Sequence, residues 1–371
     1  MDERTKVIGI NFEFNLRWYG GVNYLINIIN SFNYLEESKQ PEIIIYISEE
    51  KKEIKKLITY NKVSWVKLRH VPIHIRYLLS SIMRKNYFFH EKMNQCDYIF
   101  PFNNFPVKPL TNTKLISWIP DFQHKIYKHN FSFLNLILRE YRFKLINKYS
   151  DLLILSSNDA LKDYKKFYNK IAKKIEIIPF VSVIQEEHKK IELLKKYDLI
   201  KNKYFIISNQ FHLHKNYEIV INSFEKFYCK NKDYKLIITG TAGKNNRYYS
   251  SILNLVDDKK SKHNIIFTGF IKKSDVLSLI YFSKCLIQPS KFEGWNTAIE
   301  DCKSLGVPVI ASNISVHVEQ LGKNGNYFDI GDNNSLLKVL NELENIQEMD
   351  IKNIKLRYND FSKLILKKFE S

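Results

Sequence analysis

Residues 288–312 read QPSKFEGWNTAIEDCKSLGVPVIAS, and this segment is the strongest indication of the fold. It predicts a strand that ends near Pro289, a tight turn at Gly294, a helix from about Trp295 to the glycine stop at Gly306, and then a second strand. A strand, a helix and a second strand in this order form the βαβ unit of a parallel sheet. The residues that share one arc of the helix at 100° per residue, and that we expect to be buried, are Ala298, Ile299, Cys302 and Leu305.

The rest of the chain repeats this alternation of short apolar runs and helical segments, which is typical of α/β folds. A polar segment, Gln185–Ile200, separates two such series. We therefore expect two Rossmann-like domains, at residues 1–182 and 183–350, and a last helix at 351–371 that crosses back to the first. Two such sheets are expected to face a central cleft that binds ligands. The expected strands are 6–12, 42–47, 97–100, 114–118, 151–156 and 174–179 in the first series, and 204–208, 235–239, 264–268, 285–289 and 308–312 in the second.

Composition narrows the class of protein. The chain has 371 residues, 44% of them hydrophobic and 26% charged, which favours a globular protein over a disordered one. No apolar run approaches the roughly 18 residues of a membrane span, and residues 1–12 lack a signal-peptide pattern, so a cytoplasmic location is expected. The four cysteines form no CxxC pair, so neither a disulfide framework nor a zinc site is indicated.

The charge is strongly positive and unevenly spread. There are 58 Lys and Arg against 39 Asp and Glu, a net charge of +19, and residues 51–150 hold 19 basic and only 5 acidic side chains. Such an excess favours an anionic partner, for example a membrane surface or a phosphorylated substrate. A solvated, lysine-rich surface explains the same numbers equally well.

The loop and helix start after the strand at 285–289 suit a phosphate-containing ligand. Backbone N–H groups of Gly294, Trp295, Asn296 and Thr297 at a helix start favour a diphosphate. Glu293 beside them suits sugar hydroxyls, and Asp301 flanks the buried arc. Glu300 lies on the opposite arc, so we expect it to face solvent. The alternative is an ordinary βαβ unit whose Glu293 only complements the helix dipole.

The run E-G-W-N-T-A-I-E-D-C-K-S-L-G-V-P-V-I-A-S-N, with S-V-H-V-E-Q and Y-F-D-I-G-D after it, resembles the carboxyl-side signature of glycosyltransferase family 4. These are retaining, nucleotide-sugar-dependent enzymes with the GT-B fold. The resemblance implies that Glu293 contacts the transferred sugar. It implies that Asp301, or Glu300 in its place, contacts the nucleotide ribose.

Two further segments of the second half share the resemblance. Lys215 occupies the position of a family lysine that faces the donor diphosphate, whereas Gln210 stands where the family has arginine. His212 or His214 would add positive charge there if protonated. In the segment FTGFIKKSD, residues 267–275, the resemblance places Phe270 and Ile271 against the nucleobase, and simple loop packing is the alternative.

In the first half, Gly20 and Gly21 follow the first strand and match family glycines near the donor phosphate or the acceptor. A Gly-Gly pair by itself more often marks a turn. The segment W-I-P-D-F-Q-H, residues 118–124, is similar to a subset of the family and implies that Asp121 and His124 line the active site. The alternative is a capping aspartate and a surface histidine.

The sequence thus predicts a retaining glycosyltransferase of surface polysaccharide biosynthesis, such as lipopolysaccharide or capsule, with a free or lipid-linked saccharide as acceptor. No Asp-x-Asp follows a strand, so no metal is expected and the nucleotide sugar is a co-substrate. Ile75, Leu78, Leu79, Ile82 and Met83 form an apolar stripe with basic edges, which either faces the core or binds the inner face of an anionic membrane. The alternatives are a GT-B sugar-nucleotide epimerase and a non-enzymatic lipid- or nucleic-acid-binding protein, although no nucleic-acid module is visible.

Overall fold

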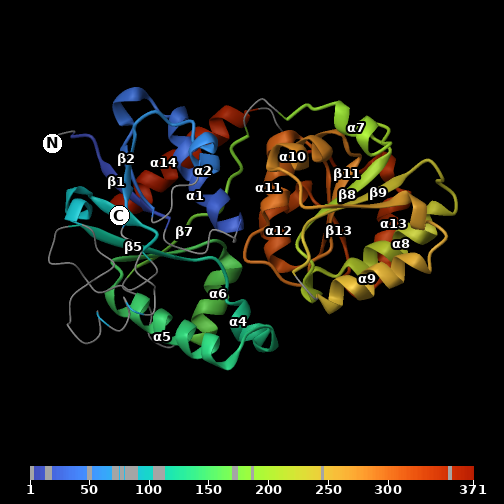
Figure 1. Cartoon of the computed structure of the whole chain (residues 1–371), viewed down its shortest axis with the longest axis horizontal. Coiled ribbons are helices and arrows are strands. Elements are labelled where there is room, and N and C mark those ends of the chain that lie inside the picture. The colour runs from blue at the N-terminus through green and yellow to red at the C-terminus, as the bar shows by residue number, and fades with distance from the viewer. Residues whose placement is uncertain are drawn as a thin grey trace. The chain divides into compact units, whose positions relative to one another are not determined.

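The computed structural model describes residues 4–12, 19–47, 52–68, 75, 79, 91–102, 113–168, 174–184, 188–243, 246–349 and 353–371. Tertiary contacts divide the chain into two compact units (Figure 1). Unit 1 consists of Met1–Val183 and Asn353–Ser371, and unit 2 is Ile184–Lys352.

Unit 1 contains a parallel sheet of seven strands in the order β3-β2-β1-β4-β5-β6-β7. Its central strands are runs of Ile, Leu and Phe that are buried on both faces, as the strands of covered parallel sheets are. The bounds are β1 Val7–Asn11, β2 Glu42–Ile47, β3 Val63–Lys67, β4 Tyr98–Phe100, β5 Lys114–Ile119, β6 Leu152–Leu155 and β7 Ile175–Ile177.

Two helices of unit 1 begin at serine caps. The Ser132 hydroxyl accepts a hydrogen bond from the backbone of Asn135, and Ser157 accepts one from Ala160, so each serine caps the helix after it. Helices whose bounds lie in the described part of unit 1 are α1 Tyr19–Ser31, α2 Lys52–Leu57, α4 Gln123–Ile126, α5 Phe133–Tyr149, α6 Asn158–Phe167 and α14 Ile354–Glu370.

The last helix, α14, belongs to unit 1 although it follows unit 2 in sequence (red in Figure 1). It packs against α1 and the short 3₁₀ turn Phe32–Tyr34. The rings of Phe369 and Phe100 lie 5.3 Å apart, and Lys368 Nζ lies 2.5 Å from the Glu176 carboxylate. These contacts join α14, a helix of 17 residues, to α1, β4 and β7 of unit 1.

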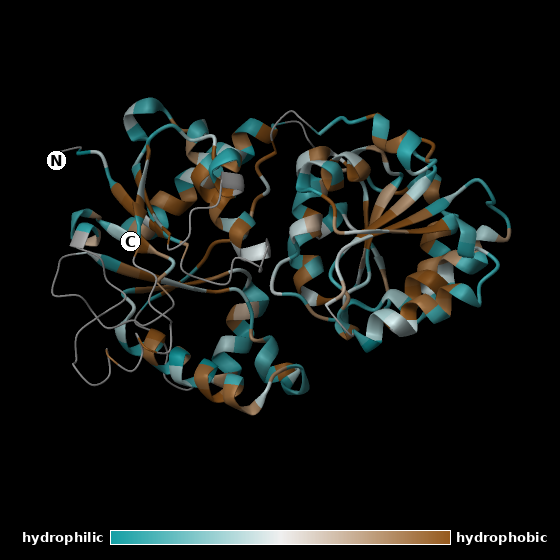
Figure 2. Cartoon of the chain, viewed as in Figure 1, coloured by the Kyte–Doolittle hydropathy of each residue, from teal (hydrophilic) through white to brown (hydrophobic). Residues whose placement is uncertain are grey.

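Unit 2 contains a second parallel sheet, of six strands in the order β10-β9-β8-β11-β12-β13. Along β8, Tyr204 and Ile206 enter one buried cluster while Phe205 and Ile207 enter the other, so both faces of this sheet are covered. Figure 2 shows these strands in brown inside helices with teal outer faces. The strands are β8 Tyr204–Ser208, β9 Lys235–Thr239, β10 Ile265–Gly269, β11 Cys285–Gln288, β12 Val309–Ser312 and β13 Asn326–Phe328; the helices are α7 Glu192–Lys196, α8 Tyr217–Tyr228, α9 Arg247–Asp257, α10 Lys273–Phe282, α11 Thr297–Leu305, α12 Ser315–Leu321 and α13 Asn333–Asn341.

The α/β class and the two-sheet architecture expected from the sequence are confirmed. Two edge strands, β3 and β13, were not expected, and α11 begins at Thr297 rather than Trp295. The apolar stripe expected at residues 75–83 lies outside the described residues except for Ile75 and Leu79. Within the described part of the chain, no helix has both the length and the hydropathy needed to cross a bilayer.

Candidate functional site

The strand order of unit 2 reverses between β8 and β11. From β8 the chain continues outward through β9 and β10, whereas β11 is followed by β12 and β13 on the other side. At such a switch point the loops after the two neighbouring strands turn away from each other, and open α/β sheets bind ligands in the crevice that remains. The loops after β8 and β11 therefore define the candidate site.

Lys215 comes from the loop after β8. It ends the 3₁₀ turn Leu213–Lys215, and the next residue, Asn216, adopts a left-handed conformation with φ 53° and ψ 48° immediately before α8. Asparagine tolerates this conformation better than most residues do. The tight turn fixes the direction in which the Lys215 side chain leaves the backbone.

Glu293 comes from the loop after β11 and meets Lys215 in a nearly buried ion pair. Their nitrogen and oxygen atoms lie 2.6 Å apart, and the two side chains are 13% and 10% exposed. The same oxygen, Glu293 Oε1, also accepts hydrogen bonds of 2.9 Å from Gln288 Nε2 and from Asn296 Nδ2. Burial pushes the pKa of Glu293 up, but the Lys215 charge and the hydrogen bonds to the carboxylate outweigh it and lower that pKa to about 2. Glu293 is therefore ionised at neutral pH.

A buried network of hydrogen bonds holds the Glu293 carboxylate in place. Gln288, the last residue of β11, donates to Ser290 and accepts from Asn209 at the end of β8. Gly240, after β9, packs so closely here that an added Cβ would lie 1.8 Å from the Asn209 carbonyl oxygen, and its φ is 141°. Only glycine fits this close approach.

Three histidines surround the pair. Burial, reinforced by the Lys215 charge, lowers the pKa of His214 to about 4, and burial lowers the pKa of His212 as well. The imidazole of His317 is fully buried, its Nδ1 lies 3.0 Å from the Ser312 carbonyl oxygen, and burial lowers its pKa to about 4. These groups are neutral at pH 7, so His212 and His214 do not add the positive charge that protonation would have supplied in place of the family arginine. Gln210, at that position, is exposed, and its side chain lies 3.2 Å from the His212 ring nitrogen.

The start of α11 is built around Asn296. Its side chain accepts a hydrogen bond of 3.0 Å from the backbone N–H of Ile299, and its own N–H donates to Gln320. Gly294, Trp295 and Thr297 are half-buried beside it. The helix start is thus capped by its own asparagine.

Glu300 was expected to face solvent, and this prediction is wrong. The residue is 0% exposed, because α12 covers that side of α11. Its carboxylate accepts a hydrogen bond of 2.8 Å from Gln320 Nε2, and Lys303 Nζ lies 3.4 Å away. The arc of apolar residues on α11 predicted one buried face correctly, but it could not show that α12 buries the face that carries Glu300.

Asp301 lies on the side of α11 that faces α10. Only 1% of it is exposed, and it pairs with Lys273, the first residue of α10. The segment before α10 contains Gly269 with φ 66°, then Phe270, which is 60% exposed, and the half-buried Ile271. Asp301 therefore lies beside the segment that carries these two candidate residues.

The remaining candidates belong to unit 1. Gly20 and Gly21 lie in the first turn of α1. Asp121 lies two residues before α4 and accepts a hydrogen bond of 2.9 Å from the backbone N–H of Gln123, the first residue of that helix. His124 is 1% exposed, and its Nε2 lies 3.1 Å from Glu140; burial lowers its pKa to about 4. It is not a surface histidine, and a part for Asp121 or His124 in catalysis stays a prediction.

The structure thus brings Lys215 and Glu293 into contact, and it places Asp301 on α11, the helix that follows the Glu293 loop. Four other candidates lie in unit 1: Gly20, Gly21, Asp121 and His124. Sequence reasoning missed Gln288, Lys273, His317 and Gln320. The S-V-H-V-E-Q run contains His317 and Gln320 and was a signal for both. Gln288 could be noticed only as the end of a strand, and Lys273 only as part of a lysine pair. No group of three or more His, Cys, Asp or Glu residues within the described ranges is arranged to hold a metal ion.

Known proteins resemble this chain in sequence. Residues 189–359 match the family model described as Glycosyl transferases group 1. An uncharacterized glycosyltransferase of Methanocaldococcus jannaschii is 25% identical over 206 residues, which cover 54% of this chain and 48% of that protein. The chain therefore aligns with about half the length of that curated relative.

Solved structures extend the likeness to nearly the whole chain. The Anabaena protein HepE in complex with UDP and glucose has a TM-score of 0.66 at 15% identity, with 99% of this chain and 96% of that chain covered. A glycosyltransferase from Rickettsia africae has a TM-score of 0.62 at 16% identity, with coverage of 98% and 96%. Sucrose-phosphate synthase from Thermosynechococcus elongatus has a TM-score of 0.61 at 11% identity, with coverage of 98% and 100%. The chain accordingly has the two-domain α/β fold of GT-B glycosyltransferase structures, and its second unit matches the glycosyl transferases group 1 model.

Proposed function

We propose that the protein is a retaining glycosyltransferase that moves a sugar from a nucleotide diphosphate to a saccharide acceptor. One observation carries the proposal: Lys215 and Glu293 meet as a nearly buried ion pair at the switch point between β8 and β11. A buried ion pair contributes little net stability, because desolvation of the charges offsets their attraction. Charged groups in such a position are better explained by a ligand than by folding.

Lys215 supplies the positive charge for the leaving group. As the bond to the sugar breaks, negative charge grows on the nucleotide diphosphate, and a fixed ammonium group stabilises it. Lys215 exchanges its Glu293 partner for a phosphate oxygen when the donor binds. The carboxylate stays in place because Gln288 and Asn296 continue to donate to it.

Glu293 binds the transferred sugar. Its low pKa keeps it an acceptor of hydrogen bonds at neutral pH. Sugar hydroxyls are donors, so the ionised carboxylate orients the sugar ring relative to the diphosphate. Backbone N–H groups of Gly294, Trp295 and Thr297, next to Glu293 in sequence, are proposed to bind the diphosphate.

UDP is the first nucleotide to test, because the Anabaena HepE structure contains UDP and glucose. The exposed ring of Phe270, followed by Ile271, offers a surface for the base. Asp301 accepts from the ribose after Lys273 moves aside. The proposed reaction needs no metal cofactor, so EDTA is expected to leave the rate unchanged.

Unit 1 is proposed to bind the acceptor, with Gly20 and Gly21 at the start of α1 and Asp121 at the start of α4 as contacts. The acceptor is a saccharide, free or lipid-linked, in surface polysaccharide synthesis. Proton magnetic resonance of the product reports whether the anomeric configuration is retained.

The test is a UDP-release assay with UDP-glucose, UDP-galactose and UDP-N-acetylglucosamine against a panel of saccharide acceptors. Release is expected only with acceptor present, and Lys215→Ala is expected to abolish it while Lys230→Ala, an exposed lysine after α8, leaves it intact. Conversion of the donor without any acceptor would contradict transfer and support an epimerase. Absence of release by the wild type with every nucleotide sugar would overturn the proposal.

A further inference from the structure

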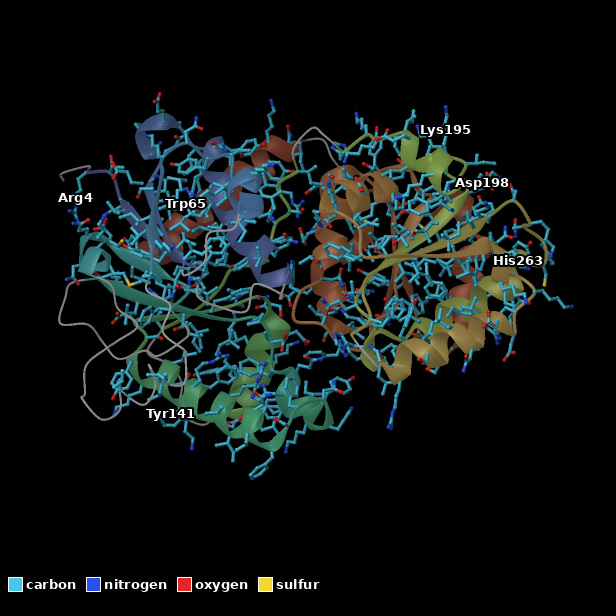
Figure 3. The ribbon with its side chains drawn as sticks, viewed as in Figure 1. Arg4, Trp65, Tyr141, Lys195, Asp198 and His263 are labelled. Carbon is cyan, nitrogen blue, oxygen red and sulfur yellow. The ribbon has the colours of Figure 1, made fainter. Side chains whose placement is uncertain are left out.

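The outer face of α5 is apolar and exposed to solvent. Exposed fractions reach 76% for Phe133, 71% for Leu134 and 62% for Leu138. Ile137 and Tyr141 are each 48% exposed on the same helix. Tyr141, labelled in Figure 3, marks this helix in unit 1. Soluble proteins rarely expose five large apolar side chains on one face of a helix unless a partner covers them.

This face is distinct from the side of α5 that packs on unit 1. Phe143 and Ile146 are buried in the cluster around Phe122, and they define the inner side of the helix. At 100° per residue the five exposed residues span about 140° on the opposite side. The core of unit 1 therefore accounts for one apolar face of α5 and leaves the other unexplained.

The charges around the outer face are positive. Lys144 and Lys148 extend it along the last turns of α5 and are exposed, as is Lys128 just before the helix. The single acid of α5, Glu140, is held 2.7 Å from Lys125 and 3.1 Å from His124. The outer face of α5 thus has cationic neighbours, and the one carboxylate at its edge is paired with a lysine.

We propose that the outer face of α5 docks on an anionic lipid surface. A helix with an apolar face and lysines at its border lies in the interface of a membrane, with the apolar side chains among the acyl chains and the lysines at the head groups. Long lysine side chains can extend to phosphate groups while their methylene carbons stay in the apolar layer. Tyrosine suits the same boundary because its ring is apolar and its hydroxyl is polar.

A lipid surface fits better than a protein partner for two reasons. The exposed residues stand on a single helix rather than in a groove, so they can enter a soft layer without a complementary cavity. The exposed lysines next to this face are positive, and the one bordering acid, Glu140, is paired with Lys125, which matches a surface of uniformly negative head groups. This inference does not depend on sugar transfer, since lipid binding is measured directly.

The test is flotation of the full-length protein with vesicles of equimolar phosphatidylcholine and phosphatidylglycerol, and with vesicles of phosphatidylcholine alone. The wild type is expected to float with the anionic vesicles and to remain below with the neutral ones. The double variant Leu134→Glu/Leu138→Glu is expected to lose at least about tenfold in vesicle partitioning, because two carboxylates now face the lipid. A matched control, Ile191→Glu/Ile200→Glu, places the same charges on exposed apolar positions of unit 2 and is expected to float like the wild type.

Charge is separated from apolar contact by Lys144→Ser/Lys148→Ser, which is expected to weaken anionic binding and to make it less sensitive to salt. Lys230→Ser/Lys260→Ser removes the same charge from unit 2 and is expected to change binding less. Circular dichroism and the melting temperature establish that each variant is folded. Equal flotation of the wild type and the folded Leu134→Glu/Leu138→Glu variant overturns the proposal. It is also overturned if the wild type does not float and light scattering shows a dimer that this variant dissociates, because a second copy of the chain then covers α5.

Discussion

The two units share a parallel-sheet architecture but use the ends of their strands differently. In unit 2, a lysine from the loop after β8 and two side-chain amides from the end of β11 and the start of α11 donate to one carboxylate oxygen, Glu293 Oε1. In unit 1, the segment after β5 turns its histidine inward, where His124 lies among the rings of Phe122, Phe143 and Tyr168. The first arrangement keeps charges ready for a ligand, and the second uses a titratable group as part of the core. A strand end in this fold therefore indicates a site only when its polar groups converge.

The largest effect is expected from breaking the convergence in unit 2. Lys215→Met leaves the Glu293 carboxylate buried without its cation, which is expected to cost about 3–5 kcal/mol of unfolding free energy. Adding Glu293→Gln removes the unpaired charge and is expected to restore most of that loss. Urea unfolding of the wild type, the single variant and the double variant measures both. A single variant as stable as the wild type would show that the pair is not a buried charge pair in solution.

The next effect is a loss of stability in acid that comes from the buried histidine of unit 1. The folded-state pKa of His124 is about 4, below the ordinary 6.5, so between these values the unfolded chain binds a proton that the folded chain does not. The stability that depends on a neutral His124 is therefore fully present above pH 6.5 and is lost as the pH drops toward 4. His124→Phe removes about 2–3 kcal/mol of this dependence.

The melting temperature as a function of pH checks this expectation. His214 and His317 titrate in the same way in unit 2, so the variant should still lose stability in acid, with a shallower slope. The Glu293 contribution falls in a lower window, between pH 4.5 and about 2, because its folded-state pKa is depressed. An unchanged slope for His124→Phe would mean that His124 is not buried and neutral.

A smaller effect is expected at Gly240. A Cβ there would lie 1.8 Å from the Asn209 carbonyl oxygen, and the φ of 141° strains any other residue. Gly240→Ala is expected to cost about 1–3 kcal/mol and to weaken donor binding, because Asn209 holds Gln288 beneath Glu293. Gly331→Ala is the matched control, since an added Cβ meets nothing within 4 Å there. Equal melting temperatures for the two variants would contradict the close approach.

The smallest effect is expected from Lys273→Ala. Its side chain is 35% exposed, so its pairing with Asp301 is partly screened by water. We expect the KM for the nucleotide sugar to change by only about threefold, with kcat nearly constant, because this residue lies away from the departing phosphate. A large fall in kcat would place Lys273 at the reacting bond instead.

The sequence predicted the parts of the fold that depend on local pattern. Buried strands such as β8 and β11 are continuous apolar runs, and β8 was predicted with its observed bounds. The edge strands β3 and β13 were not predicted because polar residues interrupt their apolar pattern, so their pairing depends on the neighbouring strand rather than on their own sequence.

The candidate site was predicted in part, for a similar reason. Lys215 and Glu293 stand 78 positions apart, and only a motif resemblance linked them. The burial of Glu300 could not be read from the arc of α11, because it depends on how α12 folds over that helix and brings Gln320 to the carboxylate. Tertiary packing decides such contacts, and a periodicity within one helix does not contain them.

The central claim is that Lys215 at the switch point of unit 2 binds the diphosphate of a nucleotide donor. It is tested most directly by calorimetric titration of UDP into the wild type, into Glu293→Gln, and into the Lys215→Met/Glu293→Gln variant that avoids an unpaired charge. Glu293→Gln is expected to bind UDP at least as well as the wild type, and the double variant is expected to bind it at least about tenfold more weakly, since a charge-assisted contact is lost. Equal Kd values for the wild type and the double variant would contradict it.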